Sequence, residues 1–140
     1  MWIENSIYKN DLEKIVQDRN IEWKKFQNKT ILITGANGLI GSNLVNTLLY
    51  ANEIFNFNCK ILALVRNEEK AIERFKKQKN ENLKFIISDI REKIECDEKI
   101  DYIIHAASQT SSKKFIEDAI NTIDISISGT KNVLEFAKKK

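Results

Sequence analysis

Apolar positions along the chain alternate between short continuous runs and series with helical spacing. Four runs have the length of buried strands: residues 31–33, 59–65, 83–88 and 101–107. Three series with helical spacing accompany them: residues 39–51, 68–79 and 115–139. Because strands that alternate with helices form parallel sheets with right-handed crossovers, the pattern predicts a doubly wound α/β sheet of about four strands.

The spacing within each series indicates its apolar face. The first helix is marked by Leu39, Ile40, Leu44, Val45, Leu48 and Leu49. The second follows a cap at Asn67 and acidic Glu68 and Glu69, with Ile72 and Phe75 pointing inward. The last long helix, bent near Gly129, is marked by Ile116, Ile120, Ile123, Ile127, Val133, Leu134 and Ala137.

Residues 1–28 precede the first strand and predict a helical extension to a domain over residues 29–140. Asn10 or Asp11 is the expected N-cap of a helix that reaches residue 19, with Leu12, Ile15 and Val16 at helical spacing. A second short stretch over residues 21–26 carries Trp23 and Phe26. We expect the extension to cover an edge or face of the domain; the alternative is a partner-binding arm.

Three glycines separate the first strand from the first long helix. Gly35, Gly38 and Gly41 lie three residues apart. Gly35 can leave the strand at backbone angles that a Cβ disfavours, and Gly41 can bring the helix close to the strand. A helix N-terminus at this point offers unpaired N–H donors and a partial positive charge, so the turn predicts a pyrophosphate site. Ser42 and Asn43 follow Gly41 without a lysine, which disfavours an ATP- or GTP-hydrolysing phosphate loop.

Composition narrows the classes of partner and compartment. The 23 basic and 20 acidic residues give a net charge of +3, too balanced to argue for nucleic acid. No apolar run approaches the about 18 residues that a membrane helix needs, and the N-terminus lacks a signal-peptide pattern, so we expect cytoplasmic residence. Cys59 and Cys96 are expected to be reduced, buried thiols, and a single histidine argues against a metal site.

Four motifs carry a family resemblance from about Lys29 onward. They are TGANGLIG from Thr34, SDI from Ser88, HAA from His105 and GTKNVLEFAK from Gly129. Together they resemble the extended short-chain dehydrogenase/reductases, in particular the NAD-dependent epimerase/dehydratase family that modifies nucleotide sugars in polysaccharide synthesis. The resemblance implies a Rossmann-like domain, an NAD(P) cofactor and, in the complete enzyme, a nucleotide-sugar substrate.

The resemblance also implies roles for individual residues. Asp89 is similar to the acid that receives the adenine amino group, although a turn cap remains the alternative. Ala106 and Ala107 resemble the small residues that let the cofactor lie against the strand end. His105 is expected to be a packed strand residue, not a base, and Ser108 and Thr110 could touch cofactor or substrate. The implied cofactor residues are Gly35, Asn37, Gly38, Leu39, Ile40, Gly41, Arg66, Asp89, Ile90, Ala106, Ala107 and Ser108.

Arg66 bears on the choice of cofactor. An acid after the second strand would hold the ribose hydroxyls of NAD, whereas a basic residue can pair with the 2′-phosphate of NADP. Arg66, helped by Asn67, therefore favours NADP. A surface arginine, or one stacked on adenine, stays open and is compatible with NAD.

The resembled family needs a Ser or Thr and a YxxxK pair for catalysis, and this chain shows neither. Tyr8, Tyr50 and Tyr102 lack a suitably placed lysine, and Ser126 stands where the family usually has asparagine. We therefore expect the N-terminal, cofactor-binding portion of such an enzyme, truncated before its catalytic region and without turnover. The alternatives are a non-catalytic NAD(P)-binding or sensing module and a reductase of a non-sugar alcohol. An exposed sheet edge predicts self-association into a homo-oligomer.

Overall fold

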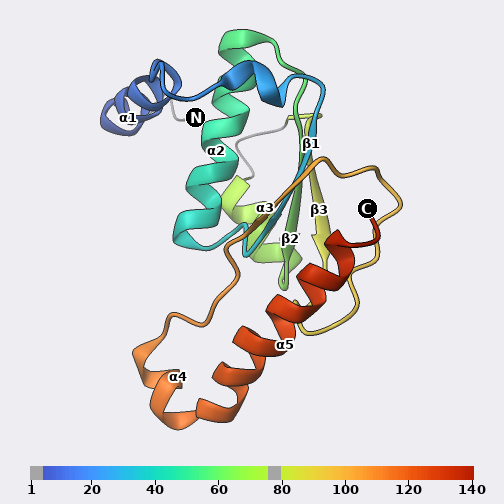
Figure 1. The fold of residues 1–140 in the computed structure, drawn as a ribbon. Helices are drawn as coiled ribbons and strands as arrows, with labels where there is room; N and C mark the ends of the chain where they lie inside the picture. The colour runs from blue at the N-terminus through green and yellow to red at the C-terminus, as the bar shows by residue number, and fades with distance from the viewer. Residues whose placement is uncertain (1–4, 76–79) are drawn as a thin grey trace.

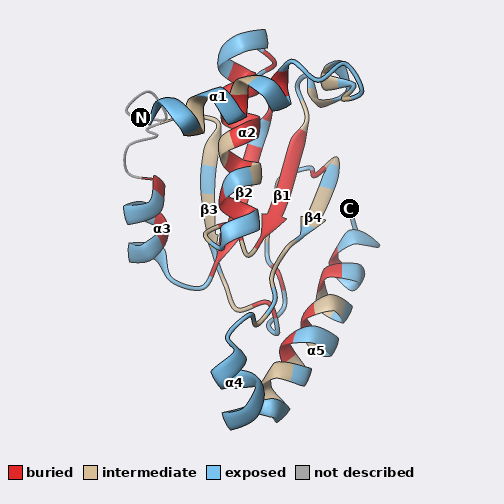
Figure 2. Ribbon diagram, turned by 90° about the vertical axis from the view of Figure 1, so that its left-hand side faces the viewer, coloured by how far each residue is buried: buried red, intermediate tan, exposed pale blue. Residues whose placement is uncertain are grey.

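The centre of the molecule is a sheet of four parallel strands (Figure 1). Their order across the sheet is β3-β2-β1-β4 (Figure 2). The computed structural model describes residues 5–75 and 80–140. The strands are β1 (Thr30–Thr34), β2 (Lys60–Val65), β3 (Leu83–Ile87) and β4 (Tyr102–His105). The main helices are α2 (Leu39–Phe55), α3 (Glu68–Phe75) and α5 (Ala119–Ala137). The predicted α/β class and four-stranded parallel sheet are confirmed.

Helices cover both faces of the sheet, so the fold has two apolar cores. Ile31 and Ile33 of β1 pack with α2 and α3 on one face. Leu32 points to the other face and packs with residues of α5. Because successive strand residues point to opposite faces, a strand covered on both sides must be apolar throughout. All of β1 is buried accordingly, and α5 shows a buried stripe toward the sheet (Figure 2).

The strand register brings three carboxyl ends together. Thr34, the last residue of β1, pairs with Leu64 on one side and with His105 on the other. In open α/β sheets ligands bind outside the carboxyl ends of the strands, where the strand order reverses. That point lies here between β1 and β4.

The N-terminal extension packs on the domain through α1 (Ser6–Val16). This helix begins four residues before the predicted cap, because Asn5 caps it by accepting a hydrogen bond from the Tyr8 amide. It ends at Val16, three residues before the predicted end, and its buried Leu12 and Val16 join the core beside α2. A short 3-10 helix, η2 (Trp23–Phe26), follows. The extension therefore packs on α2, as expected for a segment that covers a face of the domain. The domain boundary at residue 28 stays a prediction.

Several predicted helix faces and ends need correction. Ala71 and Phe75 are the buried residues of α3, and Ile72 is half-exposed. Leu39 and Ile40 are exposed and do not belong to the buried face of α2. The helix itself continues to Phe55, beyond its expected end near residue 51. The last four residues of the helix predicted over 68–79 lie outside the described residues.

The last helical region is divided at Asp118 and not at Gly129. α4 (Ser112–Glu117) ends there and α5 begins at Ala119. Gly129 lies inside α5 and leaves room for Ile90, since an added Cβ would be 2.9 Å from the Ile90 Cγ2 atom. The residues of α5 that face the sheet are Ile125, Gly129, Val133 and Phe136. The expected series is instead largely exposed, at 58–86% for Ile116, Ile120, Ile123, Ile127 and Leu134.

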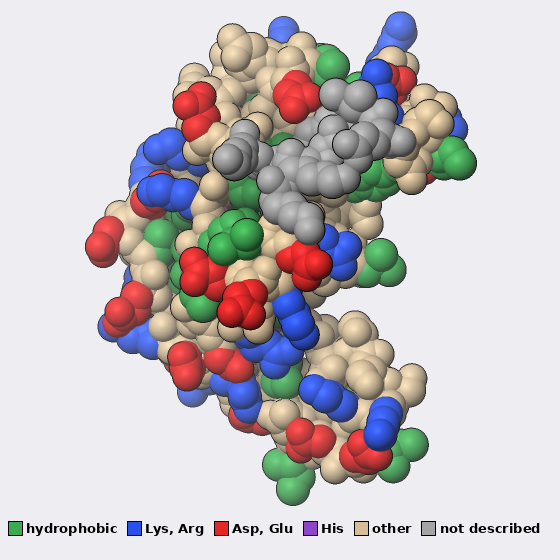
Figure 3. Space-filling view, turned by 180° about the vertical axis from the view of Figure 1, so that it is seen from behind, with side chains coloured by type: hydrophobic (Ala, Val, Ile, Leu, Met, Phe, Trp, Pro, Cys, Tyr) green, Lys and Arg blue, Asp and Glu red, His purple; other side chains and the backbone are tan. Residues whose placement is uncertain are grey.

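Acidic and basic side chains are interspersed over the face drawn in Figure 3. Cys59 and Cys96 are free, but only Cys59 is buried, and burial raises the pKa of its thiol to about 11. Within the described ranges, no helix combines the length and the apolar content that crossing a bilayer requires.

Shortening Leu12 tests whether α1 belongs to the same cooperative unit as the sheet. Leu12 is 2% exposed, so Leu12→Ala should lower the free energy of unfolding in urea by about 2–3 kcal/mol. Ile7 on the same helix is 74% exposed, and Ile7→Ala should change it by less than about 0.5 kcal/mol. Equal effects of the two substitutions would show that α1 is not packed as described.

Candidate functional site

The turn between β1 and α2 is built on two close backbone approaches. Gly35 has φ of 63°, and an added Cβ would lie 2.7 Å from the Ala107 Cα atom. An added Cβ on Gly41 would lie 2.3 Å from the Gly35 carbonyl oxygen. Real Cβ atoms do not come so near to backbone, so both positions require glycine. The turn therefore sits tightly between the first turn of α2 and the end of β4.

The N-terminus of α2 faces the carboxyl edge of the sheet. Gly38 is its N-cap, and among the described residues no side chain caps the helix there. The first intrahelical bond runs from the Ser42 amide to the Gly38 carbonyl oxygen, at 2.9 Å. The earlier N–H groups of a helix have no intrahelical acceptor, and the helix dipole makes this end partially positive. The turn is therefore suited to an anion.

A cavity of about 440 Å³ opens beside this turn. It brings together all of the predicted cofactor residues except Asp89, namely Gly35, Asn37, Gly38, Leu39, Ile40, Gly41, Arg66, Ile90, Ala106, Ala107 and Ser108. Leu39 and Ile40 do not belong to the core, and both line this cavity instead. The residues are assembled around one space, and their contact with a cofactor stays a prediction.

Asn67 and Thr110, which were named from the sequence as further candidates, also line the cavity. Five lining residues were not singled out, namely Leu64, Val65, Lys70, Gln109 and Ile125. Ile125 precedes Gly129 by four residues on α5, so helical spacing was an available signal for it. Lys70 lies in the first turn of α3, and no motif marks it. Arg66 and Lys70 place two cationic side chains at the end of the cavity formed by β2 and α3.

A larger hollow of about 710 Å³ lies elsewhere, between residues 93–97 and the end of α5. None of the predicted site residues lines it, and it has no glycine turn or helix N-terminus. Across the described residues, no group of three or more His, Cys, Asp and Glu side chains could hold a metal ion. The smaller cavity at the glycine turn is therefore the candidate site.

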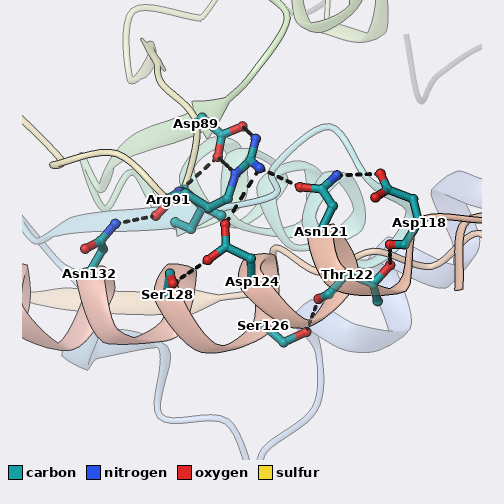
Figure 4. A network of polar contacts seen from close by, with 10 residues as sticks. Asp89, Arg91, Asp118, Asn121, Thr122, Asp124, Ser126, Ser128 and Asn132 are labelled. Carbon is teal, nitrogen blue, oxygen red and sulfur yellow. Dashed lines mark hydrogen bonds and ion pairs between the residues drawn. The ribbon is translucent and has the colours of Figure 1, made fainter.

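Asp89 lies beside the site and is held by Arg91 (Figure 4). One carboxylate oxygen accepts bonds from the Arg91 amide and Nε, both at 2.9 Å, and the other accepts from Nη2 at 2.8 Å. These bonds lower the pKa of Asp89 to about 2, with a smaller contribution from the charge of Arg66. The bond from the Arg91 amide is the turn cap considered as the alternative role. The predicted contact with adenine stays a prediction.

Arg91 connects the loop after β3 to α5. Its Nη1 donates to the Asn121 side-chain oxygen at 2.5 Å and lies 3.8 Å from the Asp124 carboxylate. Asn132 of α5 donates to the backbone oxygens of Ile90 and Glu92, at 3.1 and 3.3 Å. The loop that carries Ile90 into the cavity is therefore attached to α5 at two points.

The tyrosines lie away from the cavity. The Tyr8 hydroxyl bonds Asn43 and Asn46 between α1 and α2, and Tyr50 donates to Glu13 in the same interface. Tyr102 begins β4, at the opposite end of the strand from His105. None of the three lines the cavity, so none is placed to act on a ligand there.

Substituting Gly41 tests the close approach of α2 to β1. Gly41→Ala should lower the free energy of unfolding by about 3 kcal/mol, because backbone and not a flexible side chain opposes the new methyl group. Gly38→Ala is the matched control, since its Cβ would lie 3.2 Å from the Gly35 oxygen. It should cost about 1 kcal/mol or less. A Gly41→Ala protein as stable as Gly38→Ala would refute the described packing.

Acid titration tests the Asp89–Arg91 pair. Because the pKa of Asp89 is depressed in the folded state, its stabilising effect is complete above its ordinary pKa of 3.8 and is lost as pH falls toward about 2. Allowing for solvent screening, wild type should lose about 1 kcal/mol more stability than Asp89→Asn between pH 5 and 2. If the free energies of unfolding of the two proteins fell equally between pH 5 and 2, the pairing would be contradicted.

Comparison with known proteins places the chain in a family. The model of the NAD dependent epimerase/dehydratase family matches residues 31–140. A UDP-glucose 4-epimerase of Rickettsia canadensis is 35% identical over 120 residues, which cover 81% of this chain and 34% of that protein. A UDP-glucose 4-epimerase of Rickettsia prowazekii is 34% identical over 118 residues, or 80% and 33% of the two chains. The chain thus spans about a third of the length of these relatives.

Solved structures show the same fold. An epimerase of Methanothermobacter thermautotrophicus has a TM-score of 0.67 at 23% identity, and the match covers 83% of this chain and 33% of the epimerase chain. A dTDP-glucose 4,6-dehydratase of Streptomyces venezuelae, solved with NAD and TYD bound, has a TM-score of 0.60 at 22% identity, with 76% and 34% covered. The family match extends over β1 to α5 and includes every residue that lines the cavity. This chain belongs to the NAD-dependent epimerase/dehydratase family.

Proposed function

We propose that this chain binds a nicotinamide dinucleotide in the cavity at the carboxyl edge of the sheet. The observation that carries the proposal is the uncapped N-terminus of α2 behind the glycine turn, which offers N–H donors to a pyrophosphate. The half-buried Ala106 and Ala107 line the cavity beside it, and such small side chains leave room for a flat ligand. Membership of an NAD-dependent family supports the same ligand.

We further propose that NADP is the preferred form. Arg66 at the end of β2 and Lys70 in α3 both line the cavity, so two positive charges stand where a 2′-phosphate would lie. Asn67, between them, caps α3 by accepting a hydrogen bond from the Lys70 amide at 2.8 Å. This cap holds the start of α3 beside Arg66. A 2′-phosphate could then receive charge-assisted bonds from both cations.

In the whole protein we propose that this domain serves a nucleotide-sugar epimerase or dehydratase. The support is the family match and the similarity to UDP-glucose 4-epimerases. When bound, the dinucleotide would supply reversible hydride transfer with a sugar carbon of the substrate. The chain supplies the surface that holds and orients the dinucleotide. No tyrosine among the described residues reaches the cavity, so we assign to this chain binding and not proton transfer.

Calorimetric titration with NADP and with NAD tests both proposals. Wild type should bind one dinucleotide per chain, and NADP more tightly. Arg66→Ala and Lys70→Ala should each weaken NADP binding about tenfold and change NAD binding by less than about threefold, because only the 2′-phosphate contact is lost. Arg74→Ala is the matched control, since Arg74 lies on α3 and does not line the cavity.

The outcomes separate the two proposals. Absence of binding for both dinucleotides would refute the cofactor site. Binding of NAD and NADP with equal affinity, unchanged by Arg66→Ala and Lys70→Ala, would refute the preference for NADP and leave the site itself intact.

A further inference from the structure

The single histidine of the chain stands at the junction of three elements. His105 is the last residue of β4 and immediately precedes Ala106 and Ala107, which line the cavity. Both of its ring nitrogens have partners. Nδ1 lies 2.7 Å from the Thr34 hydroxyl at the end of β1, and Nε2 lies 3.2 Å from the Thr130 hydroxyl on α5. Neither partner is charged.

The direction of these hydrogen bonds follows from a carbonyl group on α5. The Thr130 hydroxyl donates to the Ser126 carbonyl oxygen at 2.6 Å, and a carbonyl can only accept. Since the hydroxyl has one proton, its oxygen must accept from His105, so Nε2 carries the ring proton. In the neutral ring Nδ1 is then an acceptor, and the Thr34 hydroxyl donates to it. His105 is exposed, so the expectation of a packed strand residue is wrong. Partial desolvation of its ring still lowers the pKa of His105, which favours the neutral form near pH 7.

The Thr34 hydroxyl connects the His105 ring to the backbone of Ala107, which lines the cavity. The side chain of Thr34 is fully buried, and its oxygen accepts a hydrogen bond from the Ala107 amide at 3.2 Å. A buried hydroxyl proton without an acceptor is costly, and Nδ1 of His105 supplies that acceptor. The Ala107 backbone held in this way is the same backbone that approaches Gly35 so closely that no Cβ fits between them.

We propose that His105 is a positioning residue for the dinucleotide site. As the Nε2–H tautomer it orients the Thr34 hydroxyl, and through it the Ala107 amide, so that Ala106 and Ala107 stay at a fixed distance from the glycine turn. Through Thr130 it also attaches the end of β4 to α5, which contributes Ile125 to the cavity. This role rests on the proposed function, because the wall that it orders is the one assigned to the cofactor.

Nitrogen-15 NMR of the ligand-free chain tests the tautomer directly. Because there is one histidine, the ring signals need no assignment by substitution. At pH 7.5 the two-bond correlations should show a protonated Nε2 and an unprotonated Nδ1, and Thr130→Val should reduce the share of this tautomer. A ring in which Nδ1 carries the proton would overturn the inference, since Thr34 could no longer donate to it.

Two substitutions of His105 separate positioning from general stability. His105→Leu removes both ring nitrogens, so dinucleotide affinity should fall about tenfold and hydrogen exchange of the Ala107 amide should accelerate by a similar factor. His105→Asn keeps an acceptor near the position of Nδ1 and should restore affinity to within about threefold of wild type. Tyr102→Phe, at the far end of β4, is the control and should leave both quantities unchanged. Circular dichroism of each variant confirms that the fold is retained.

The results distinguish this inference from the proposed function. If wild type binds dinucleotide and His105→Leu binds it equally well with unchanged exchange at Ala107, the positioning role is refuted and the cofactor site stands. Equal losses for His105→Asn and His105→Leu would also refute it, because the restored acceptor would then have no effect. If wild type binds no dinucleotide, the proposed function fails, and the positioning role fails with it.

Discussion

The structure depends on how closely three pieces of backbone approach one another at the end of β1. Gly41 brings the first turn of α2 against the Gly35 carbonyl, and Gly35 in turn lies against the backbone of Ala107. Side chains are excluded from both contacts, so α2 starts directly over the strand ends with its N–H groups toward the cavity. The candidate site is a consequence of this packing, since the same contacts position the helix dipole and the small-residue wall.

Much of the fold follows from the period of the apolar residues. β1 and β2 are buried on both faces, and their uninterrupted apolar runs are typical of central parallel strands. The helix faces were less predictable. In α5 two apolar stripes exist, and spacing alone does not say that Ile125, Val133 and Phe136 meet the sheet while Ile120 and Ile127 are exposed. The division at Asp118 also has no Gly or Pro to mark it. The cap at Asn5 was missed because Asn10 and Asp11 lie closer to the apolar series that begins at Leu12.

The site was more predictable than the helix faces because its motifs specify backbone geometry. The glycine turn, Arg66 and the two alanines are drawn together by parallel strands whose carboxyl ends share one edge. Lys70 was missed because it belongs to no motif and lines the cavity from the first turn of α3. The bonds of Asp89 to Arg91, two residues away, could not be read from its motif, and its predicted contact with adenine stays a prediction. The hydrogen bonds of His105 join residues far apart in the chain, which no local pattern reveals.

We propose that the turn from Gly35 to Gly41 holds the pyrophosphate of a dinucleotide. Two-dimensional amide NMR of the labelled chain, recorded while NADP or NAD is added, tests it most directly. We expect the largest shifts at the amides of Leu39, Ile40 and Gly41, with further shifts at Ala106 and Ala107. Shifts confined to the hollow between residues 93–97 and the end of α5, or no shifts at all, would contradict it.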